Sequence, residues 1–168
     1  RTTRVWLERD VRVCYNGVDT EAYRPLCLPR SDRYLFLARF SRIKSPLETI
    51  KVCREAGVGL DLIGDTSITN EPDLLRECMA LVDGKQIRMI GPVSRGNCVW
   101  WFSQAKALLH LIRWPEPFGL APVEAQLCGT PVISGDAGAM RETVQDGKTG
   151  FIIKSDEAAV KLLKEDVV

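Results

Sequence analysis

Short apolar runs alternate along the chain with longer segments in which apolar residues recur every three or four positions. The short runs predict strands at residues 34–38, 60–63, 87–90, 107–112, 132–133 and 150–153. The longer segments predict helices at residues 45–56, from 70 or 71 to 82, 97–105, 119–128, 139–145 and 156–165. Residues 11–15 alternate like a further short strand before a turn at Asn16-Gly17. Buried strands alternating with amphipathic helices predict a doubly wound, parallel α/β sheet in a single domain, residues 1–168.

Two of these helices begin at recognisable local signals. Ser45 is followed by Pro46 and Glu48, which is the pattern of a capping box with proline at the first helical position. Gly119 is the expected N-cap of a later helix, because Pro122 then falls in the first turn, where a missing N–H does no harm.

Composition excludes several classes of function. The 168 residues include 23 Lys and Arg and 22 Asp and Glu, so a net charge of +1 argues against a nucleic-acid partner. The six cysteines form no C-x-x-C pair and there is one histidine, so no zinc site is expected. Most of the cysteines fall on apolar faces, which is typical of reduced, buried thiols in a cytosolic protein. No apolar run is long enough to span a membrane.

Ligands in such a fold bind beyond the carboxyl ends of the strands, where the informative loops of this chain lie. The strand ending at Ala38 is followed by neither a G-x-G-x-x-G fingerprint nor a phosphate-binding P-loop, which argues against an NAD or FAD enzyme. It is followed instead by two cations, Arg39 and Lys44. An arginine can hold phosphate with two bonds and a lysine acts as a point charge, so the pair could bind a diphosphate; the alternative is that both are surface charges.

The stretch from residue 113 to residue 125 carries the other candidate groups. The free backbone amides of residues 118–120 would point out of a helix end with a partial positive charge, which attracts phosphate. Glu116 lies just before that end and Glu124 about one turn inside it. One bound molecule could therefore meet both carboxylates and the amides, and a nucleotide carrying a polyhydroxylated group suits this arrangement.

Several motifs occur in a recognisable order. They are Asn16-Gly17-Val18-Asp19, the segment 36–46, Glu116-Pro117-Phe118-Gly119-Leu120 with Glu124-Ala125, Cys128-Gly129-Thr130-Pro131, and Glu142 with the segment 146–151. This ordered set resembles the carboxyl-terminal domain of the group 1 glycosyltransferases, also called family 4. These are retaining enzymes with two facing Rossmann-like domains, the GT-B fold. The resemblance extends from about Val11 to Val168.

The resemblance implies a role for each matching residue. Arg39 and Lys44 match the pair that binds the donor's diphosphate and helps the nucleoside diphosphate to leave. Glu116 matches the glutamate that faces the transferred sugar, and with Arg39 and Lys44 it forms the expected catalytic set. Glu124 matches the glutamate that takes the ribose hydroxyls. Further donor contacts are expected from the backbone amides of Phe118, Gly119 and Leu120, from the backbone of Val93 to the base, and from a loop near the sugar at Gly138 and Glu142.

Two positions depart from the family pattern, and four aromatic positions are open to more than one interpretation. Ala38 and Ala139 stand where the family usually has glycine, so their methyl groups are expected to crowd the ligand and tune the site. His110 lies in the most apolar strand and is interpreted as a packed or hydrogen-bonded core residue in preference to a catalytic one. Trp100 and Trp101 are interpreted as helix packing, whereas Trp114 could border the donor pocket.

The predicted function is the donor-binding domain of a retaining glycosyltransferase (hexosyltransferase) that moves a sugar from a nucleotide-sugar, such as a UDP-, GDP- or ADP-sugar, to an acceptor hydroxyl. The resemblance implies no cofactor and no metal. The alternatives are a non-catalytic nucleotide-sugar-binding module and a related GT-B enzyme such as a sugar-nucleotide epimerase or phosphorylase. Neither end of the sequence resembles a natural terminus, so we expect the chain to be part of a larger protein. The resemblance implies that the other part is an amino-terminal Rossmann-like domain that carries the acceptor site, and we therefore expect the isolated chain to be inactive. We expect a cytoplasmic protein, and peripheral association with the inner face of a membrane is left open because the missing half would decide it.

Overall fold

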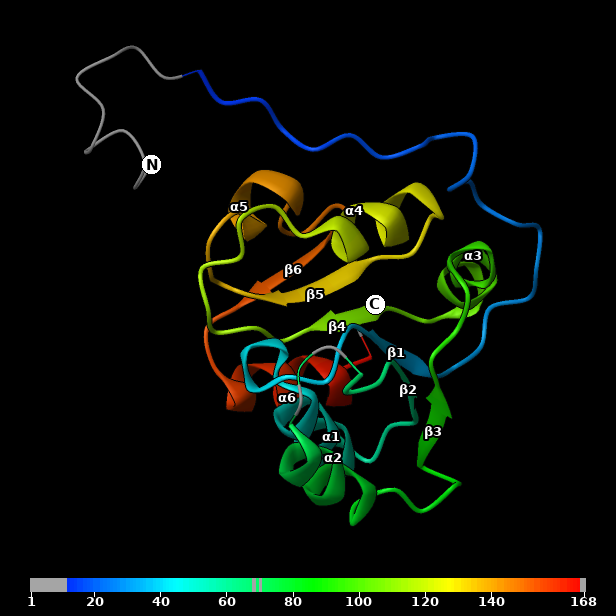
Figure 1. Cartoon of the computed structure of the whole chain (residues 1–168), viewed down its shortest axis with the longest axis vertical. Helices are drawn as coiled ribbons and strands as arrows, with labels where there is room; N and C mark the ends of the chain where they lie inside the picture. Colours follow the sequence, from blue (N-terminus) through cyan, green and yellow to red (C-terminus); the bar gives the residue numbers. More distant parts are fainter. Residues whose placement is uncertain (1–11, 68, 70, 167–168) are drawn as a thin grey trace.

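A computed structural model describes residues 12–67, 69 and 71–166 of the chain. They form a six-stranded sheet in the order β3-β2-β1-β4-β5-β6, and every neighbouring pair of strands is parallel (Figure 1). This is the order of a doubly wound Rossmann fold, which confirms the predicted fold class. The strands are β1 (Tyr34–Leu37), β2 (Leu60–Ile63), β3 (Ile87–Gly91), β4 (Leu108–His110), β5 (Val132–Gly135) and β6 (Gly150–Ile153).

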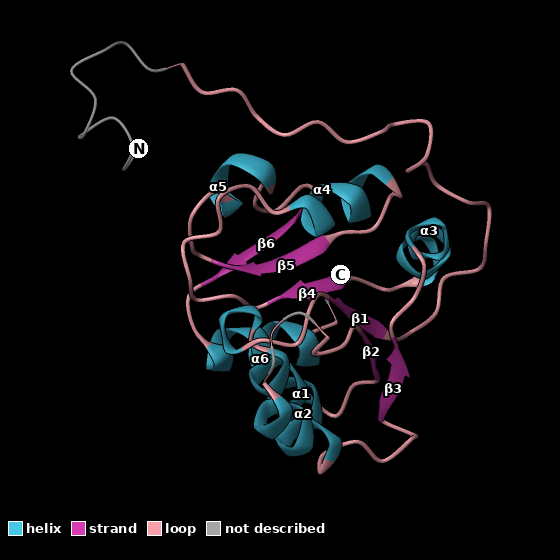
Figure 2. Ribbon diagram, viewed as in Figure 1, coloured by secondary structure: helices cyan, strands magenta, loops and turns pink. Residues whose placement is uncertain are grey.

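Helices cover both faces of the sheet (Figure 2). One face carries α1 (Pro46–Ala56), α2 (Pro72–Met79) and α6 (Asp156–Lys164), and the other carries α3 (Arg95–Gln104), α4 (Leu120–Leu127) and the short α5 (Met140–Thr143). A 3-10 turn, η2 (Arg42–Lys44), precedes α1. None of the helices in the described part of the chain has the length and apolar character needed to cross a bilayer.

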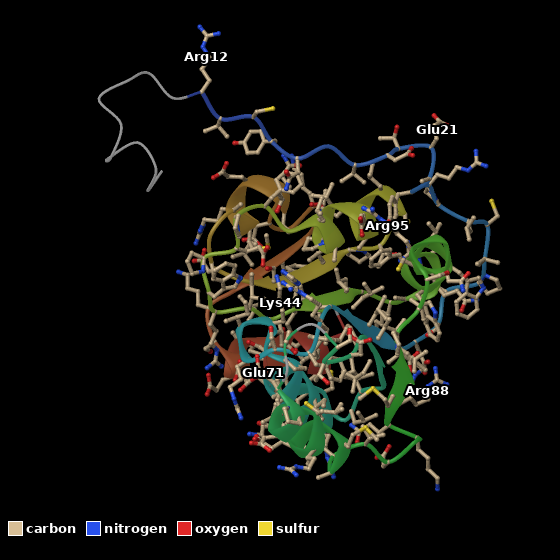
Figure 3. The ribbon with its side chains drawn as sticks, in the orientation of Figure 1. Arg12, Glu21, Lys44, Glu71, Arg88 and Arg95 are labelled. Carbon is tan, nitrogen blue, oxygen red and sulfur yellow. The ribbon has the colours of Figure 1, made fainter. Side chains whose placement is uncertain are left out.

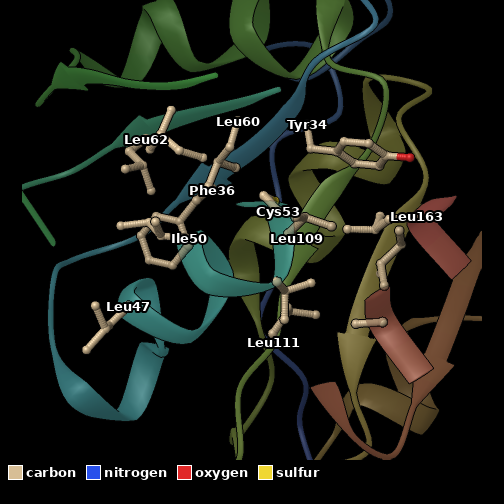
Figure 4. Packing of buried hydrophobic residues seen from close by; sticks show 14 of the residues in the cluster. Tyr34, Phe36, Leu47, Ile50, Cys53, Leu60, Leu62, Leu109, Leu111 and Leu163 are labelled. Atoms are coloured by element: carbon tan, nitrogen blue, oxygen red, sulfur yellow. The ribbon is translucent and has the colours of Figure 1, made fainter. Parts of the chain in front are cut away.

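Side-chain alternation along each strand divides the core into two clusters. Tyr34 and Phe36 of β1 pack with α1, α2 and α6, whereas Leu35 between them packs with α3 and α4. Leu109 and Leu108 of β4 divide in the same way (the first cluster is shown in Figure 4). Because consecutive side chains of a strand point to opposite faces, four apolar residues in a row supply both layers at once. This explains why the strands read as continuous apolar runs.

Most predicted elements are confirmed, with shifted ends. The strands at 60–63 and 150–153 have the predicted bounds, and Gly119 is the N-cap of α4. The strand predicted at 107–112 is shorter, because the Ile112 amide donates to the His110 carbonyl at 2.8 Å and the chain turns out of the sheet. The helix predicted to reach Val82 ends at Met79, which is 45% exposed.

Two local predictions are wrong. Val11 lies outside the described residues, and residues 12–15 form no strand, because this segment runs above α4 and α5 with no strand beside it and its Val13 is 72% exposed (Figure 1). Ser45 does not cap α1 with its side chain. It has a left-handed φ of 55° at the end of η2, and its amide donates to the Arg42 carbonyl instead. Side-chain capping needs an extended N-cap, which this tight turn does not provide.

Gly150 offers a test of the sheet's close packing. A Cβ built on this residue would lie 1.9 Å from the carbonyl oxygen of Val132 in the neighbouring strand β5. We therefore expect Gly150→Ala to lower the free energy of unfolding by about 3 kcal/mol, measured by urea denaturation. Gly96→Ala, in α3, is the matched control, because nothing lies within 4 Å of its Cβ position. The control should be neutral or slightly stabilising, and equal effects of the two substitutions would contradict this account of the β5–β6 contact.

Candidate functional site

A pocket of about 460 Å³ opens at the carboxyl ends of β1 and β4. These two central strands are neighbours, and the chain leaves β1 toward α1 on one face and β4 toward α4 on the other (Figure 1). Such a switch point is where open α/β sheets bind ligands, since the two connections diverge and leave a crevice. The polar side chains that line the pocket are those of Asn16, Arg39, Lys44, His110, Glu116 and Glu124.

The amino-terminal end of α4 forms one wall of the pocket. Gly119 has a φ of 83°, and a Cβ there would lie 2.5 Å from the Met140 side chain, so this turn requires glycine. Phe118, Gly119 and Leu120 all line the pocket. Among the described residues, the amides of Phe118 and Gly119 have no hydrogen-bond acceptor, and the amide of Leu120, the first helical residue, has none within the helix. The helix end therefore offers free donors and a partial positive charge to an anion.

Glu116 is held from two sides. Trp114 Nε1 donates to its Oε2 at 3.0 Å, and Lys44 Nζ forms an ion pair with the same oxygen. Burial alone would raise the pKa of the Glu116 carboxyl, but the bonds from Lys44 and Trp114 and the charge of Lys44 together outweigh it and lower that pKa. Glu116 is therefore an anion at neutral pH, and its Oε1 has no partner among the described residues.

The two predicted phosphate-binding cations line the same pocket but differ in state. The Lys44 side chain, which is labelled in Figure 3, is only 14% exposed and is paired with Glu116. Arg39 is exposed and forms no ion pair with any described residue. A ligand entering the pocket therefore meets one unpaired guanidinium and one ammonium that already shares a carboxylate.

Glu124 lies on α4 and is buried, with 7% exposure. Arg95 Nη2 of α3 lies 3.6 Å from its Oε1, and Arg95 Nε donates to the Tyr23 hydroxyl at 3.4 Å. Sequence reasoning missed Arg95, because nothing in its local pattern indicates that α3 and α4 bring it next to a glutamate. Val93 lines a smaller cavity of about 190 Å³ that shares Leu37, Ala38 and Arg39 with the main pocket. The predicted base contact thus lies directly beside the predicted phosphate contact.

The predicted sugar loop packs against Glu116. Gly138 has a φ of 61°, and a Cβ there would lie 2.3 Å from the Glu116 amide nitrogen and carbonyl oxygen. The next amide, of Ala139, donates to the Glu116 carbonyl at 2.8 Å. Of the two methyl groups expected to crowd the ligand, that of Ala38 lines the pocket, whereas Ala139 is buried and is not part of the lining.

The segment before β1 lies over the edge of the site. The Tyr15 hydroxyl donates to Glu142 Oε2 at 2.5 Å, and the Tyr15 ring lies 6.1 Å from the Phe118 ring. Asn16 then lines the pocket itself. Sequence reasoning placed Asn16 in a turn and in the first family motif but not in the pocket, because a contact between residues a hundred positions apart leaves no local signal.

His110 is buried as predicted, with 4% exposure, but it also lines the pocket. Its Nε2 has no hydrogen-bond partner in the described part of the chain, so the predicted alternative of a hydrogen-bonded core residue is not observed. Burial lowers the pKa of this imidazole to about 4, and the nearby Lys44 charge acts in the same direction, while Glu116 opposes them. The side chain is therefore neutral at pH 7.

The cysteines and acidic residues of the described segments indicate no metal site beside the pocket. Cys53, Cys78, Cys98 and Cys128 are buried free thiols, as expected for most of the six, whereas Cys14 and Cys27 are exposed. Within residues 12–67, 69 and 71–166, no group of three or more His, Cys, Asp or Glu side chains is arranged to hold a metal ion.

Comparison with known proteins agrees with this architecture. Residues 29–166 match the sequence profile of the family described as "Glycosyl transferases group 1". A D-inositol 3-phosphate glycosyltransferase of Arthrobacter sp. (strain FB24) is 29% identical over an alignment of 160 residues, and the match covers 85% of this chain and 38% of that protein. The chain thus spans well under half the length of this relative.

Two solved structures share the fold. Sucrose-phosphate synthase from Thermosynechococcus elongatus matches with a TM-score of 0.82 at 23% identity, over 96% of this chain and 45% of that one. HepE of Anabaena, solved in complex with UDP and glucose, matches with a TM-score of 0.75 at 22% identity, over 92% of this chain and 46% of that one. The predicted family resemblance and fold are therefore confirmed.

The buried imidazole predicts a particular pH dependence of stability. The folded-state pKa of His110 is about 4, whereas an unfolded histidine titrates near 6.5. Between these values the unfolded state binds more protons, so the free energy of unfolding is unaffected by the titration of His110 above about pH 6.5 and decreases as the pH falls toward 4. The loss is on the order of 3 kcal/mol.

His110→Leu removes this contribution, and apart from Glu116, whose pKa His110 also helps to lower, the carboxylates keep the same surroundings in both proteins. We expect urea denaturation between pH 4 and 7 to show a steeper fall for the wild-type chain than for the variant. Parallel curves of unfolding free energy against pH for the two proteins would contradict the lowered pKa of His110.

Proposed function

The chain belongs to the group 1 glycosyl transferases, and we propose that its pocket binds the nucleotide-sugar donor of a retaining glycosyltransferase. The observation that carries this proposal is the convergence, at the β1–β4 switch point, of a free helix end, two cations and two carboxylates on one pocket. Each part of a nucleotide-sugar finds complementary chemistry there. HepE, which shares the fold, was solved with UDP and glucose, and this supports the same class of ligand.

The diphosphate is assigned to Arg39, Lys44 and the amides of residues 118–120. Arg39 supplies an unpaired guanidinium, which can bind two phosphate oxygens at once. Lys44 can bridge from Glu116 to a phosphate oxygen without leaving its carboxylate, because an ammonium group has three donors. The free amides of the α4 end complete the cradle.

The two carboxylates are assigned to the two polyhydroxylated ends of the donor. Glu124, one turn inside α4, accepts the ribose hydroxyls, and Val93 in the adjoining cavity contacts the base through its backbone. Glu116 faces the transferred sugar, and its unpartnered Oε1 can accept from a sugar hydroxyl. The Trp114 bond fixes the orientation of this carboxylate, and the packing of Gly138 fixes its backbone.

Catalysis by these residues is electrostatic. As the bond between the anomeric carbon and the diphosphate breaks, negative charge grows on the departing phosphate oxygens. Arg39, Lys44 and the α4 end are already oriented toward that charge, so little reorganisation is needed when it develops. In the proposed reaction an acceptor hydroxyl oxygen then bonds to the anomeric carbon with retained configuration, and the hydroxyl proton passes to the departing diphosphate. No step of this scheme requires a metal ion.

A second Rossmann-like domain completes the proposed enzyme. The chain covers 38% of the Arthrobacter relative and 46% of HepE, so each has room for a further domain. We propose that this other half carries the acceptor site and closes over the pocket from the side to which the strand ends point.

Donor binding is tested by a thermal-shift panel of UDP, GDP, ADP and their sugar conjugates. A ligand at about 100 times its Kd should raise the free energy of unfolding by about 2.7 kcal/mol. We expect the ligands of one base to stabilise the chain. Glu124→Gln should weaken their binding about tenfold or more, because the ribose hydroxyls lose a charged acceptor. Glu55→Gln, an exposed change on α1, is the matched control. No stabilisation by any of these ligands would contradict the proposed donor site.

Transfer activity is tested separately, by product analysis. The chain alone should show no measurable sugar transfer, and activity should appear when the amino-terminal half is supplied as part of the same polypeptide. NMR of the product should show the anomeric configuration of the donor. Sugar transfer by the chain alone would contradict the proposal that the acceptor site lies in the other half of the protein. A product with inverted anomeric configuration would contradict a retaining mechanism.

A further inference from the structure

We propose that His110 is a donor-binding residue whose neutral imidazole N–H donates to a diphosphate oxygen from the floor of the pocket. The inference rests on the proposed function, and it adds to the site a side chain whose sequence context indicated only a core role.

The fold aims this side chain at the pocket and not at the centre of the core. His110 is the last residue of β4 and alternates with Leu109, so it lies on the same face of the sheet as Leu108, the face covered by α4. Its backbone is fixed by pairing with Ser134 of β5, whose hydroxyl donates to the His110 carbonyl at 3.2 Å. Being at the carboxyl end of its strand, it meets the pocket beside Leu37 and the α4 end.

The hydrogen bonding of this residue is incomplete in the free protein. Its Nε2 is buried without a partner among the described residues. A neutral imidazole carries one N–H donor and one acceptor nitrogen, and leaving a buried polar group unpaired destabilises the fold. An apolar side chain would fill the same position at lower cost. A hydrogen-bond partner supplied by the bound ligand would therefore explain why this position holds a histidine.

The neighbouring groups select the kind of partner. His110 lies close enough to both Lys44 and Glu116 for their charges to act on its pKa. These residues and the free amides of the α4 end surround the position assigned to the diphosphate. A phosphate oxygen can only accept hydrogen bonds, and the His110 ring N–H is a donor. Glu116, the nearby carboxylate, is already paired with Lys44, so a phosphate oxygen is the acceptor that a ligand would bring to His110. A neutral donor also binds the anion without adding a buried charge to the free site.

The single histidine of this chain makes a direct test clean. In a chain labelled with ¹⁵N-histidine, long-range ¹H–¹⁵N spectra show the two ring nitrogens of His110 alone. We expect saturating nucleoside diphosphate, whichever of UDP, GDP and ADP binds, to move the protonated ring-nitrogen signal, and the matching nucleoside to leave it in place. Binding of the diphosphate with an unmoved ring signal would overturn the inference while leaving the donor site intact.

Two variants test the inference independently, because one of them should raise the melting temperature of the free protein and at the same time weaken ligand binding. His110→Leu should melt at a higher temperature than wild type without ligand, because a buried unpaired group is removed, yet bind the nucleoside diphosphate about 10- to 100-fold more weakly by calorimetry. His110→Gln retains an N–H donor and should recover part of that affinity. Affinity for the nucleoside without phosphates should be the same in all three proteins.

The outcomes separate the two proposals. Unchanged diphosphate affinity in a folded His110→Leu chain would show a purely structural imidazole and overturn the inference alone. A change of equal size for nucleoside and nucleoside diphosphate would reject the phosphate contact. If no nucleoside diphosphate binds the wild-type chain, the donor site fails and His110 loses its assigned partner with it.

Discussion

The ion pair between Lys44 and Glu116 joins two connections that the topology would otherwise separate. Lys44 ends the turn after β1, which leads to α1 on one face, and Glu116 precedes α4 on the other face. The two connections leave the sheet toward opposite faces at this point, and they form opposite walls of the crevice. Both side chains are largely buried, with 14% and 11% exposure, and Trp114 shares the carboxylate. The pair therefore links the two walls of the pocket in the absence of ligand.

Close backbone contacts outside the pocket hold this arrangement in place. Gly138 lies against Glu116 and Gly64 against the Ala38 carbonyl, where a Cβ would approach to 2.3 and 1.9 Å. Both contacts bring a loop from a neighbouring strand against a pocket-forming segment. Such approaches leave no space for adjustment, so the orientation of Glu116 and the position of the β1 loop are determined by the backbone. The groups that would meet a ligand are thus preorganised by residues that never touch it.

How far the sequence predicts this structure depends on whether the information is local. The strand at 60–63 and the start of α4 follow from apolar runs and glycines that stand beside them in the sequence. The strand expected at 11–15 requires a neighbouring strand, which alternation cannot supply. Ser45 carries the right capping side chain, but the preceding turn imposes a left-handed backbone. Arg95 and His110 were not assigned to the site, because their roles depend on which face of the sheet a distant helix covers.

The charges in the pocket divide it into a fixed end and an adaptable end. Lys44 pairs with Glu116 below the surface, where a change of partner is costly, so a diphosphate joins this pair without replacing it. Arg95 Nη2 lies 3.6 Å from Glu124 Oε1, which is longer than a hydrogen bond, and the Arg95 side chain is 80% exposed whereas that of Glu124 is only 10% exposed. A ribose can therefore displace Arg95 from Glu124 at small cost. The diphosphate would thus bind beside the buried Lys44–Glu116 pair, while the part of the pocket that takes the nucleoside retains the freedom to accommodate it.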